Sequence, residues 1–444
     1  MSTSANNFRL YAYLGAGGIF LALLAFIFFG FPDPKPMAPL VEEDKPIKKK
    51  QLQPRLQKST LGGSKRLADG PADGEGSEEN RSIIPGEVII HGKSEAELQL
   101  IYSMALEAGG ELKGGIRQLL ALRMQFPSKE AADKFRESLG DGDYGDSNYI
   151  VLAPDFPTDE ELAGRSPTTI SDQPNRNTNG TTGLQPFGDG ALEFLGVTED
   201  NSAWGQDLTI AILDSGVYAH ESLSGINIKQ YDLVETPEDP QADYTGHGTA
   251  VADIAHLVAP SADILSVRVL DSEGIGDTFT VAEGIITAAD NGANVINLSL
   301  GSYGDSYVLR EAVDYATDRG VAVVAASGND GLEQVSYPAA YENVIGVTAV
   351  DAAGQFADFS NTGDGVDLGA PGVGIYTAWE EDGQVSFSGT SAAAPFVAAA
   401  IAANQTRNPG YTTAQAAARL RQSAKDTGEA GVDPQTGAGI ITLE

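Results

Sequence analysis

The longest stretch with a regular hydrophobic pattern runs from about residue 191 to residue 444. Short apolar runs alternate there with segments of helical periodicity near 246–258, 279–291 and 306–319. Buried apolar strands that alternate with helices predict an α/β fold with a parallel sheet covered by helices on both faces. The predicted strands are Leu208–Leu213, Ala262–Leu270, Ala293–Leu300, Val321–Ala326 and Val344–Val350.

Residues 84–153 show strand and helix patterns at a much shorter spacing. In chain order these patterns give β-α-β-α-β, the arrangement of a small α+β domain of the ferredoxin-like kind. The stretch Glu111–Lys113 leaves room for one extra strand. The predicted segments are the strands 86–92, 119–126 and 148–153 and the helices Ser94–Ala108 and Ser128–Leu139.

A single long apolar stretch, Leu10–Phe31, contains 22 residues without a charge. At about 1.5 Å per residue, a helix of this length crosses the hydrocarbon core of a bilayer. The stretch is longer than the apolar region of a typical signal peptide, and no small-x-small cleavage site follows it. We therefore expect a transmembrane anchor after a short tail, residues 1–9, with a cleaved signal peptide as the alternative.

Two regions rich in Pro, Gly and polar residues separate these parts. Residues 32–83 lack apolar periodicity and predict a flexible linker. Residues 154–190 predict an exposed linker that is open to proteolytic processing. The expected organisation is thus tail, anchor, linker, small domain 84–153, second linker, and large domain 191–444.

Charge and composition exclude several classes of function. The net charge is −34, and residues 67–444 alone carry 18 basic and 58 acidic residues. Such a surface repels phosphate backbones, so we expect no nucleic-acid partner; solubility and adaptation to salt both fit the acidity. The chain has no cysteine, which excludes disulfides, thiolate catalysis and cysteine-ligated metal sites.

Ser391 lies in the sequence "FSGTSAAAP", at the start of an alanine-rich run that predicts a helix. A serine at this position is commonly a helix cap. A catalytic serine would also need a histidine base, a carboxylate that orients the base, and donors for the oxyanion. No histidine follows Ser391 and the motif is not Gly-x-Ser-x-Gly, so the nucleophile elbow of the α/β-hydrolases is excluded.

Three residues of the large domain could supply the missing groups. His247 lies between two glycines where a predicted helix begins, whereas His91, His220 and His256 have more ordinary structural explanations. Asp214 ends a buried strand, where a carboxylate is costly unless another group pairs with it. Asn329 also follows a buried strand and could donate to an oxyanion. Asp214 and Asn329 could each be simple turn residues when considered alone.

Five segments together resemble the signature blocks of subtilisin-like serine proteases, over roughly residues 190–444. They are "AILDSGV", "GHGTAVADI", "NLSLGS", "AASGNDG" and "FSGTSAAAP". The resemblance implies a serine endopeptidase with Asp214, His247 and Ser391 as catalytic triad. It also implies an oxyanion site formed by the Asn329 side chain and the Ser391 backbone N–H.

The resemblance extends to substrate binding. Ser299, Leu300 and Gly301 resemble the strand that pairs with an extended substrate, and Ala326 and Gly328 resemble walls of the primary specificity pocket. Both walls are small, which favours a sizeable apolar side chain in the substrate. Ser336 stands where the family usually has a glycine at the floor of this pocket, which weakens that preference.

Residues 84–153 resemble the family's propeptide, an intramolecular chaperone and inhibitor, although a stalk domain of unrelated role is the alternative. Together with Leu10–Phe31, this implies a membrane-anchored zymogen that acts on protein or peptide substrates. Arg9 precedes the anchor whereas Lys35, Lys45 and Lys48–Lys50 follow it, so the positive-inside rule favours a cytoplasmic protease domain. We nevertheless expect an extracytoplasmic domain, tethered or released after processing, because a zymogen suits export and long domains translocate largely regardless of charge.

Alternatives to this interpretation concern metals and activity. The family implies no cofactor for catalysis and often binds structural calcium, but no acidic ligand set has a defined spacing here. A zinc site of His220, His247 and His256 is disfavoured because the chain lacks an H-E-x-x-H motif. A non-enzymatic relative used as a binding module, and a zymogen that never releases its N-terminal domain, are the alternative functions.

Overall fold

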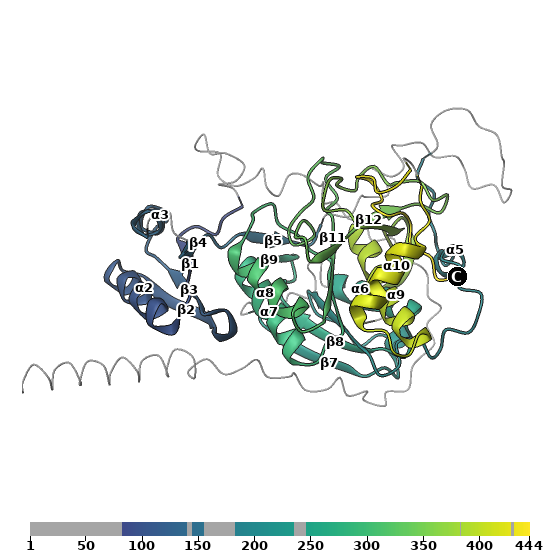
Figure 1. Cartoon of the computed structure of the whole chain (residues 1–444), viewed down its shortest axis with the longest axis horizontal. Helices are drawn as coiled ribbons and strands as arrows, with labels where there is room; N and C mark the ends of the chain where they lie inside the picture. The colour runs from purple at the N-terminus through teal and green to yellow at the C-terminus, as the bar shows by residue number, and fades with distance from the viewer. Residues whose placement is uncertain (1–81, 140–143, 155–182, 235–245, 382, 428–429) are drawn as a thin grey trace, which may run out of the picture. The chain divides into compact units, whose positions relative to one another are not determined.

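The protein is described by a computed structural model for residues 82–139, 144–154, 183–234, 246–381, 383–427 and 430–444. The described chain divides into two compact units, Ile84–Asn148 and Tyr149–Glu444 (Figure 1). No helix within these ranges is both long enough and apolar enough to span a membrane. The predicted tail, anchor and linker, residues 1–81, lie outside the described residues, as does most of the predicted linker 154–190.

The first unit is a four-stranded sheet in the order β2-β3-β1-β4 with two helices. Its apolar core joins the strands to both helices and includes Val88, Ile90, Leu98, Met124 and Phe135. Serine side chains cap the two helices, as the sequence pattern leads one to expect. The elements are β1 Glu87–His91, α2 Glu95–Glu107, β2 Glu111–Ile116, η2 Arg117–Leu119, β3 Ala121–Gln125, α3 Lys129–Ser138 and β4 Gly145–Asp146.

Comparison with the predicted small domain gives one confirmation and one correction. The extra strand expected near Glu111–Lys113 is present as β2. The stretch 148–153 is a strand, β5 (Ile150–Leu152), but it pairs with β9 (Ile275–Asp277) of the second unit. The unit boundary accordingly falls between Asn148 and Tyr149, and β4 supplies the fourth strand. Hydrophobic pattern identifies a strand but does not identify its partner.

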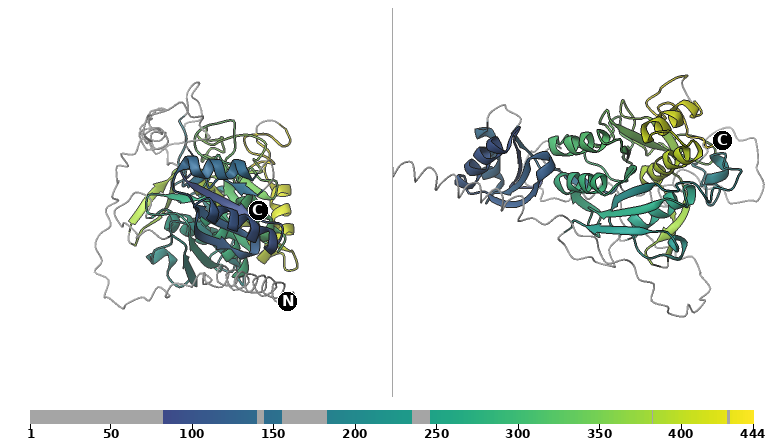
Figure 2. Two further views of the ribbon diagram at one scale, coloured as in Figure 1. Left: turned by 90° about the vertical axis from the view of Figure 1, so that its left-hand side faces the viewer. Right: turned by 60° about the horizontal axis from the view of Figure 1, so that its bottom comes forward.

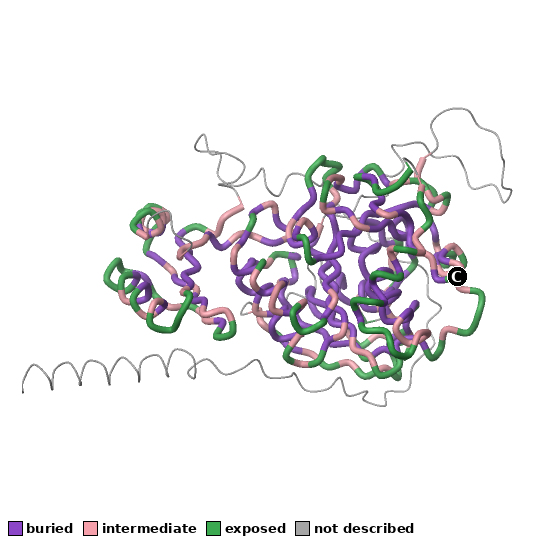
Figure 3. Tube along the Cα trace, viewed as in Figure 1, coloured by how far each residue is buried: buried purple, intermediate pink, exposed green. Residues whose placement is uncertain are grey.

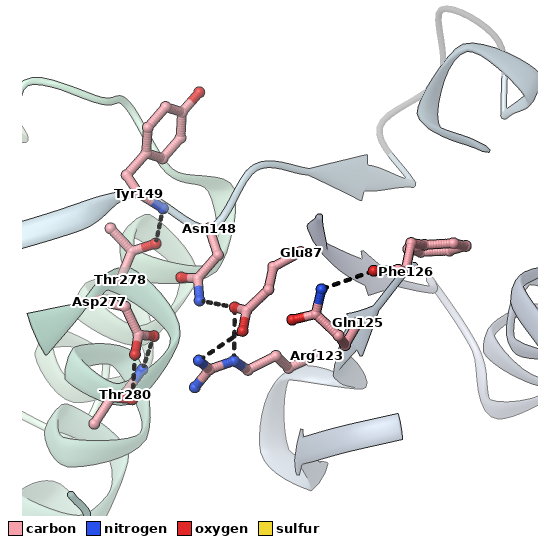
Figure 4. Close-up of polar contacts among 9 residues, drawn as sticks. All are labelled: Glu87, Arg123, Gln125, Phe126, Asn148, Tyr149, Asp277, Thr278 and Thr280. Atoms are coloured by element: carbon pink, nitrogen blue, oxygen red, sulfur yellow. Dashed lines mark hydrogen bonds and ion pairs between the residues drawn. The ribbon is translucent and has the colours of Figure 1, made fainter. Parts of the chain in front are cut away.

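A polar cluster within the first unit ties its last residues to its sheet (Figure 4). Arg123 donates two hydrogen bonds to the carboxylate of Glu87, at 2.8 and 2.9 Å. The side chain of Asn148 donates a third to the same carboxylate at 2.7 Å. The buried charge of Glu87 is therefore paired in a bidentate geometry, which offsets its desolvation.

The second unit is built on a seven-stranded parallel sheet in the order β13-β12-β11-β10-β6-β8-β7. All five predicted strands are present, which confirms the parallel sheet. Two edge strands, β7 and β13, were not predicted because they are short and one of them is partly exposed. The bounds are β6 Thr209–Asp214, β7 Ile228–Asp232, β8 Asp263–Arg268, β10 Val295–Leu298, β11 Ala322–Ala326, β12 Val344–Val350 and β13 Leu368–Pro371.

Helices cover both faces of this sheet (Figure 1, Figure 2). Ile210 and Ile212 of β6 pack in one core cluster with residues of α6 and α9, whereas Leu213 approaches Gly284 of α7. Alternate residues of one strand thus contact opposite helical layers. The helices are α6 His247–Val258, α9 Thr390–Arg407 and α10 Thr413–Ser423 on one side and α7 Thr278–Asp290 and α8 Tyr307–Thr317 on the other.

Helix α9 is the buried centre of its layer: its residues Thr390–Asn404 are all buried (Figure 3). Its many alanines allow this close packing against the sheet and against α6. Smaller elements complete the unit. They are α5 Ala191–Phe194, η3 Glu221–Leu223, β9 Ile275–Asp277, and the hairpin of β14 Ile375–Trp379 and β15 Gly383–Phe387.

Residues 183–190 differ from the exposed linker that the sequence predicts. Phe187 is buried in the core cluster, Gln185 donates its N–H to Asp351 at 3.0 Å, and Gly188 pairs with Ile375. The large unit therefore begins before residue 191. A single phenylalanine among turn-forming residues was too weak a signal to reveal this packing.

Candidate active site

The candidate residues gather at one edge of the parallel sheet. Strands β6, β10 and β11 are neighbours in the sheet, and their carboxyl ends lie at the same edge. Asp214 is the last residue of β6, Ser299 follows β10, and Asn329 comes shortly after β11. The first turn of α9 joins this edge through hydrogen bonds from Ser391 and Thr390. The structure therefore brings these four chain segments together.

Asp214 and His247 form a buried pair. Nδ1 of His247 lies 2.7 Å from Oδ1 of Asp214, and neither residue is exposed to solvent. An ionised carboxylate can only accept a hydrogen bond, so a contact with an ionised Asp214 favours the imidazole tautomer with its proton on Nδ1. The ring of Phe387 contacts the imidazole edge-on, with the ring centres 5.4 Å apart.

Gly248 allows the helix that carries His247 to approach the end of β6. A Cβ atom at this position would lie 2.1 Å from the carbonyl oxygen of Gly216 and 3.2 Å from Cβ of Asp214. No side chain fits there without moving the backbone. Since α6 begins at His247, this close approach brings the imidazole to the carboxylate.

Ser391 is held by reciprocal hydrogen bonds with Ser299. The hydroxyl of Ser391 donates to the Ser299 carbonyl at 3.3 Å, and the hydroxyl of Ser299 donates to the Ser391 carbonyl at 2.9 Å. The second bond has a cause in the sequence. Pro395 has no N–H, so the helical bond that residue 395 would donate to the Ser391 carbonyl cannot form.

The hydrogen bond from Ser299 to the Ser391 carbonyl predicts how Ser299→Ala changes stability with and without Pro395. Ser299→Ala leaves the buried Ser391 carbonyl without this donor, and we expect a loss of about 1–3 kcal/mol in the free energy of unfolding. Pro395→Ala restores a helical N–H, so Ser299→Ala should cost measurably less in that background. Denaturant unfolding of both single variants and of the double variant measures the difference.

Ser261→Ala is the matched control, because the exposed hydroxyl of Ser261 donates to the Ser202 carbonyl at 2.7 Å, away from this site. We expect it to change the unfolding free energy little. Equal costs for Ser299→Ala in the wild-type and Pro395→Ala backgrounds would show that the proline and the serine do not compensate each other.

Asn329 is oriented by the residue that begins α9. Its Oδ1 accepts hydrogen bonds from the N–H of Thr390 at 2.9 Å and from the Thr390 hydroxyl at 2.8 Å. With the oxygen so engaged, Nδ2 is directed over Gly389, and a Cβ atom on that glycine would lie 2.8 Å from it. Gly389 has φ 139°, which also favours glycine. The site thus presents an amide donor beside the N-terminus of a buried helix.

The residues assigned to the specificity pocket lie around Ser336. The hydroxyl of Ser336 donates to the carbonyls of Ser327 (3.1 Å) and Ala326 (3.3 Å). A Cβ atom at Gly301 would lie 2.5 Å from that hydroxyl. Ser336 therefore fills space between Gly301 and the end of β11, where a glycine would leave it open. Gly328 is close as well, with φ 107°.

A polar cluster next to Gly328 was not predicted. Asn361 donates to the hydroxyl of Tyr303 at 2.8 Å, and its oxygen accepts from the N–H groups of Asp330 and Leu332. The Tyr303 hydroxyl donates in turn to the carboxylate of Asp330. Burial and the neighbouring Asp330 carboxylate raise the pKa of Tyr303. Asp330 directly follows Asn329, but no pattern in the sequence pairs it with Tyr303 or Asn361.

The other histidines of this unit are His220 and His256. Both ring nitrogens of His220 are engaged: Nδ1 lies 2.8 Å from Oγ of Ser222, and Nε2 lies 3.1 Å from the Gly383 carbonyl. His256 is partly buried in α6, and burial lowers its pKa. In the described ranges, no group of three or more His, Asp or Glu residues could hold a metal ion. This arrangement does not fit the alternative zinc site.

Comparison with known proteins agrees with this geometry. A sequence model of the subtilase family matches residues 205–439, which is more than half of the chain. The chain is 39% identical over 247 residues to the minor extracellular protease Epr of Bacillus subtilis (strain 168), covering 53% of this chain and 38% of Epr. It is 39% identical over 249 residues to subtilisin Savinase of Lederbergia lenta, covering 54% of this chain and 90% of that protein.

A solved structure extends the similarity. Fervidolysin from Fervidobacterium pennivorans, a keratinolytic enzyme related to subtilisin, matches with a TM-score of 0.65 and 26% sequence identity. The match covers 81% of this chain and 60% of fervidolysin, and so reaches beyond residues 205–439. The chain therefore belongs to the subtilase family of subtilisin-like serine endopeptidases.

Proposed function

We propose that this protease cleaves peptide bonds with Asp214, His247 and Ser391 as its catalytic triad, through an acyl-enzyme. The observation that carries the proposal is the buried 2.7 Å contact between Asp214 and Nδ1 of His247, at the sheet edge where Ser391 lies in the first turn of α9. A carboxylate buried against an imidazole fixes its tautomer and makes Nε2 a base. The comparisons support a serine protease, and the residue roles are our assignment.

The reaction follows from these groups. Ser391 Oγ attacks the scissile carbonyl while His247 Nε2 takes its proton, and Asp214 stabilises the imidazolium that forms. The proton then passes to the leaving amine, and the acyl group stays on Ser391 as an ester. Water, activated by the same imidazole, hydrolyses the ester and frees the new carboxyl end of the substrate. The positive end of α9 stabilises negative charge near Ser391 throughout.

Asn329 and the Ser391 N–H form the oxyanion site in this proposal. We expect Asn329→Ala to lower kcat by about 10²–10³-fold, the range known for the equivalent change in subtilisin, with little change in KM. The reason is that an oxyanion donor acts on charge that develops only in the transition state. Kinetics on a chromogenic peptide separate the two constants. A rise in KM at unchanged kcat would instead assign Asn329 to substrate binding.

Extended protein or peptide chains are the proposed substrates, bound along Ser299, Leu300 and Gly301. One extended segment of the chain itself already pairs with this edge: Leu152 and Gly301 exchange two backbone hydrogen bonds of 2.9 Å. Ala326, Gly328 and Ser336 then line the pocket for the side chain next to the scissile bond. Because Ser336 fills part of that space, large side chains should fit less well than small or medium ones.

We assign the first unit, with the strand that follows it, to a propeptide, so that the protein is made as a self-processing zymogen. The support is the position of residues 84–148 before the protease unit and the continuation of the chain into β5, which pairs beside the proposed substrate strand. Processing would fall within 154–190 and leave the first unit as an inhibitor. The alternative is a zymogen that keeps its N-terminal unit and acts on itself or on one partner.

Membrane attachment through residues 10–31, with an extracytoplasmic or released protease unit, is part of the same proposal. Its support is the uncharged stretch of 22 residues in the sequence. Structural calcium stays a prediction without assigned ligands, and the proposed reaction uses no cofactor.

Hydrolysis of casein by the purified full-length chain tests the proposed protease function. Failure of a folded chain to hydrolyse casein, with or without calcium, would favour a non-enzymatic binding module.

A further inference from the structure

The segment Tyr149–Pro154 lies in the second unit as an added strand. On one side β5 pairs antiparallel with β9, with Val151 opposite Gly276. Figure 4 shows where this pairing ends: the N–H of Tyr149 donates to the hydroxyl of Thr278 at 3.2 Å. On the other side Leu152 pairs antiparallel with Gly301. The segment is therefore held along both of its edges.

Several contacts hold this segment firmly. The N–H of Ala153 donates to the Gly274 carbonyl at 2.9 Å, and the N–H of Thr278 donates to the Tyr149 carbonyl at 3.0 Å. Val151 is fully buried and Ala153 is 4% exposed. Main-chain bonds on both edges combined with buried alternate side chains are typical of a peptide bound by strand addition. The segment thus occupies the position of an extended substrate.

The register places a proline beside the nucleophile. Leu152 and Gly301 form a hydrogen-bonded antiparallel pair, and the next pair of this kind lies two residues after Leu152 and two residues before Gly301. Extended by one more pair, this register brings Pro154 opposite Ser299. Ser299 is the residue whose carbonyl contacts Ser391 Oγ at 3.3 Å. In this extended register, Pro154 takes the position that precedes the bond that Ser391 would attack.

A proline in this position removes a hydrogen bond of the ladder. Any other residue would donate its N–H to the Ser299 carbonyl, whereas Pro154 has no N–H. In the structure the Ser299 carbonyl instead accepts from the Ser391 hydroxyl. The Ser299 carbonyl has a second lone pair, so a substrate with an N–H at this position would gain an anchoring hydrogen bond to it. Pro154 cannot form that bond, and its carbonyl is held less firmly for attack.

We infer that Pro154 is a brake on self-cleavage: Tyr149–Pro154 occupies the substrate strand but is cleaved slowly at the bond that follows Pro154. In this step the Pro154–Asp155 peptide bond breaks and an ester forms between the Pro154 carbonyl and Ser391 Oγ. The serine proton passes through His247 to the amine of Asp155, and water then releases the Pro154 carboxylate. The inference rests on the proposed serine protease function and concerns the control of that same site.

Two synthetic peptides, covering residues 149–160 with either proline or alanine at position 154, test the brake on the processed enzyme. We expect the alanine peptide to be cleaved after residue 154 with kcat/KM at least about tenfold higher, equivalent to about 1.4 kcal/mol. The proline peptide should inhibit the hydrolysis of an unrelated chromogenic peptide competitively. Mass spectrometry of the products identifies the cleaved bond.

The full-length Pro154→Ala variant should likewise process itself faster than wild type, with Asp155 as the new N-terminus. Pro127→Ala is the matched control, because Pro127 is an exposed proline of the first unit outside the added strand. Equal rates for the two peptides, or cleavage at another bond in both, would overturn the inference while casein hydrolysis upholds the function. Loss of casein hydrolysis as well would overturn the proposed function together with the inference.

Discussion

Replacing Ser391 with alanine is expected to lower the kcat of casein hydrolysis by about 10⁶-fold, the magnitude known for the nucleophile of subtilisin. The change removes only the hydroxyl, whose hydrogen bond to the Ser299 carbonyl is long, at 3.3 Å. Stability should therefore change little, because the stronger bond, from Ser299 to the Ser391 carbonyl, remains. Initial rates of casein hydrolysis and denaturant unfolding measure the two properties separately.

The same variant tests the zymogen proposal. Full-length wild type should cut itself within 154–190, whereas the Ser391→Ala chain should stay intact when it is prepared and stored identically. Gel electrophoresis and sequencing of any new N-terminus identify the cut. Cleavage of both chains at the same bond and rate would assign the processing to another protease.

Replacing Asp214 with asparagine is expected to lower kcat by about 10⁴-fold. An asparagine has nearly the same shape, but its amide can donate to the imidazole and favour the wrong tautomer of His247. The pair is fully buried at 2.7 Å, so no water can take over the role of the carboxylate without rearrangement. Steady-state kinetics on a chromogenic peptide give kcat and KM.

The matched control for this change is Asp263→Asn, because Asp263 is exposed at the amino end of β8, away from the carboxyl edge of the sheet. It should leave kcat within about twofold of wild type. If Asp214→Asn kept nearly full activity, its carboxylate would have only a structural role and the proposed triad would fail.

Much of the protease unit could be predicted because its signals are local. The apolar runs are nearly continuous and the strands are buried on both faces, so the strands around Asp214, Ser299 and Asn329 follow from the sequence. Parallel strands end at a common edge, so these residues were expected to lie near one another. His247 is the first residue of α6 and Ser391 is the second residue of α9, so both lie close to the predicted helix starts.

Features that depend on contacts between distant segments were not predictable. The strand 148–153 was recognised, but its pairing with β9 and Gly301 depends on the register between segments more than 100 positions apart. The hydrogen bond from the Ser299 hydroxyl to the Ser391 carbonyl joins two positions that no spacing rule connects. The Tyr303, Asp330 and Asn361 cluster is of the same kind, because each residue alone is an ordinary loop residue.

The most direct test of the central claim is covalent labelling of the processed enzyme with a fluorophosphonate, followed by mass spectrometry of its peptides. A serine activated by His247 should react, so we predict one phosphonylated residue, Ser391, and loss of casein hydrolysis in proportion to labelling. Asp214→Asn should label much more slowly. Full inactivation with the label on a different serine, or complete labelling of Ser391 without loss of hydrolysis, would contradict the account.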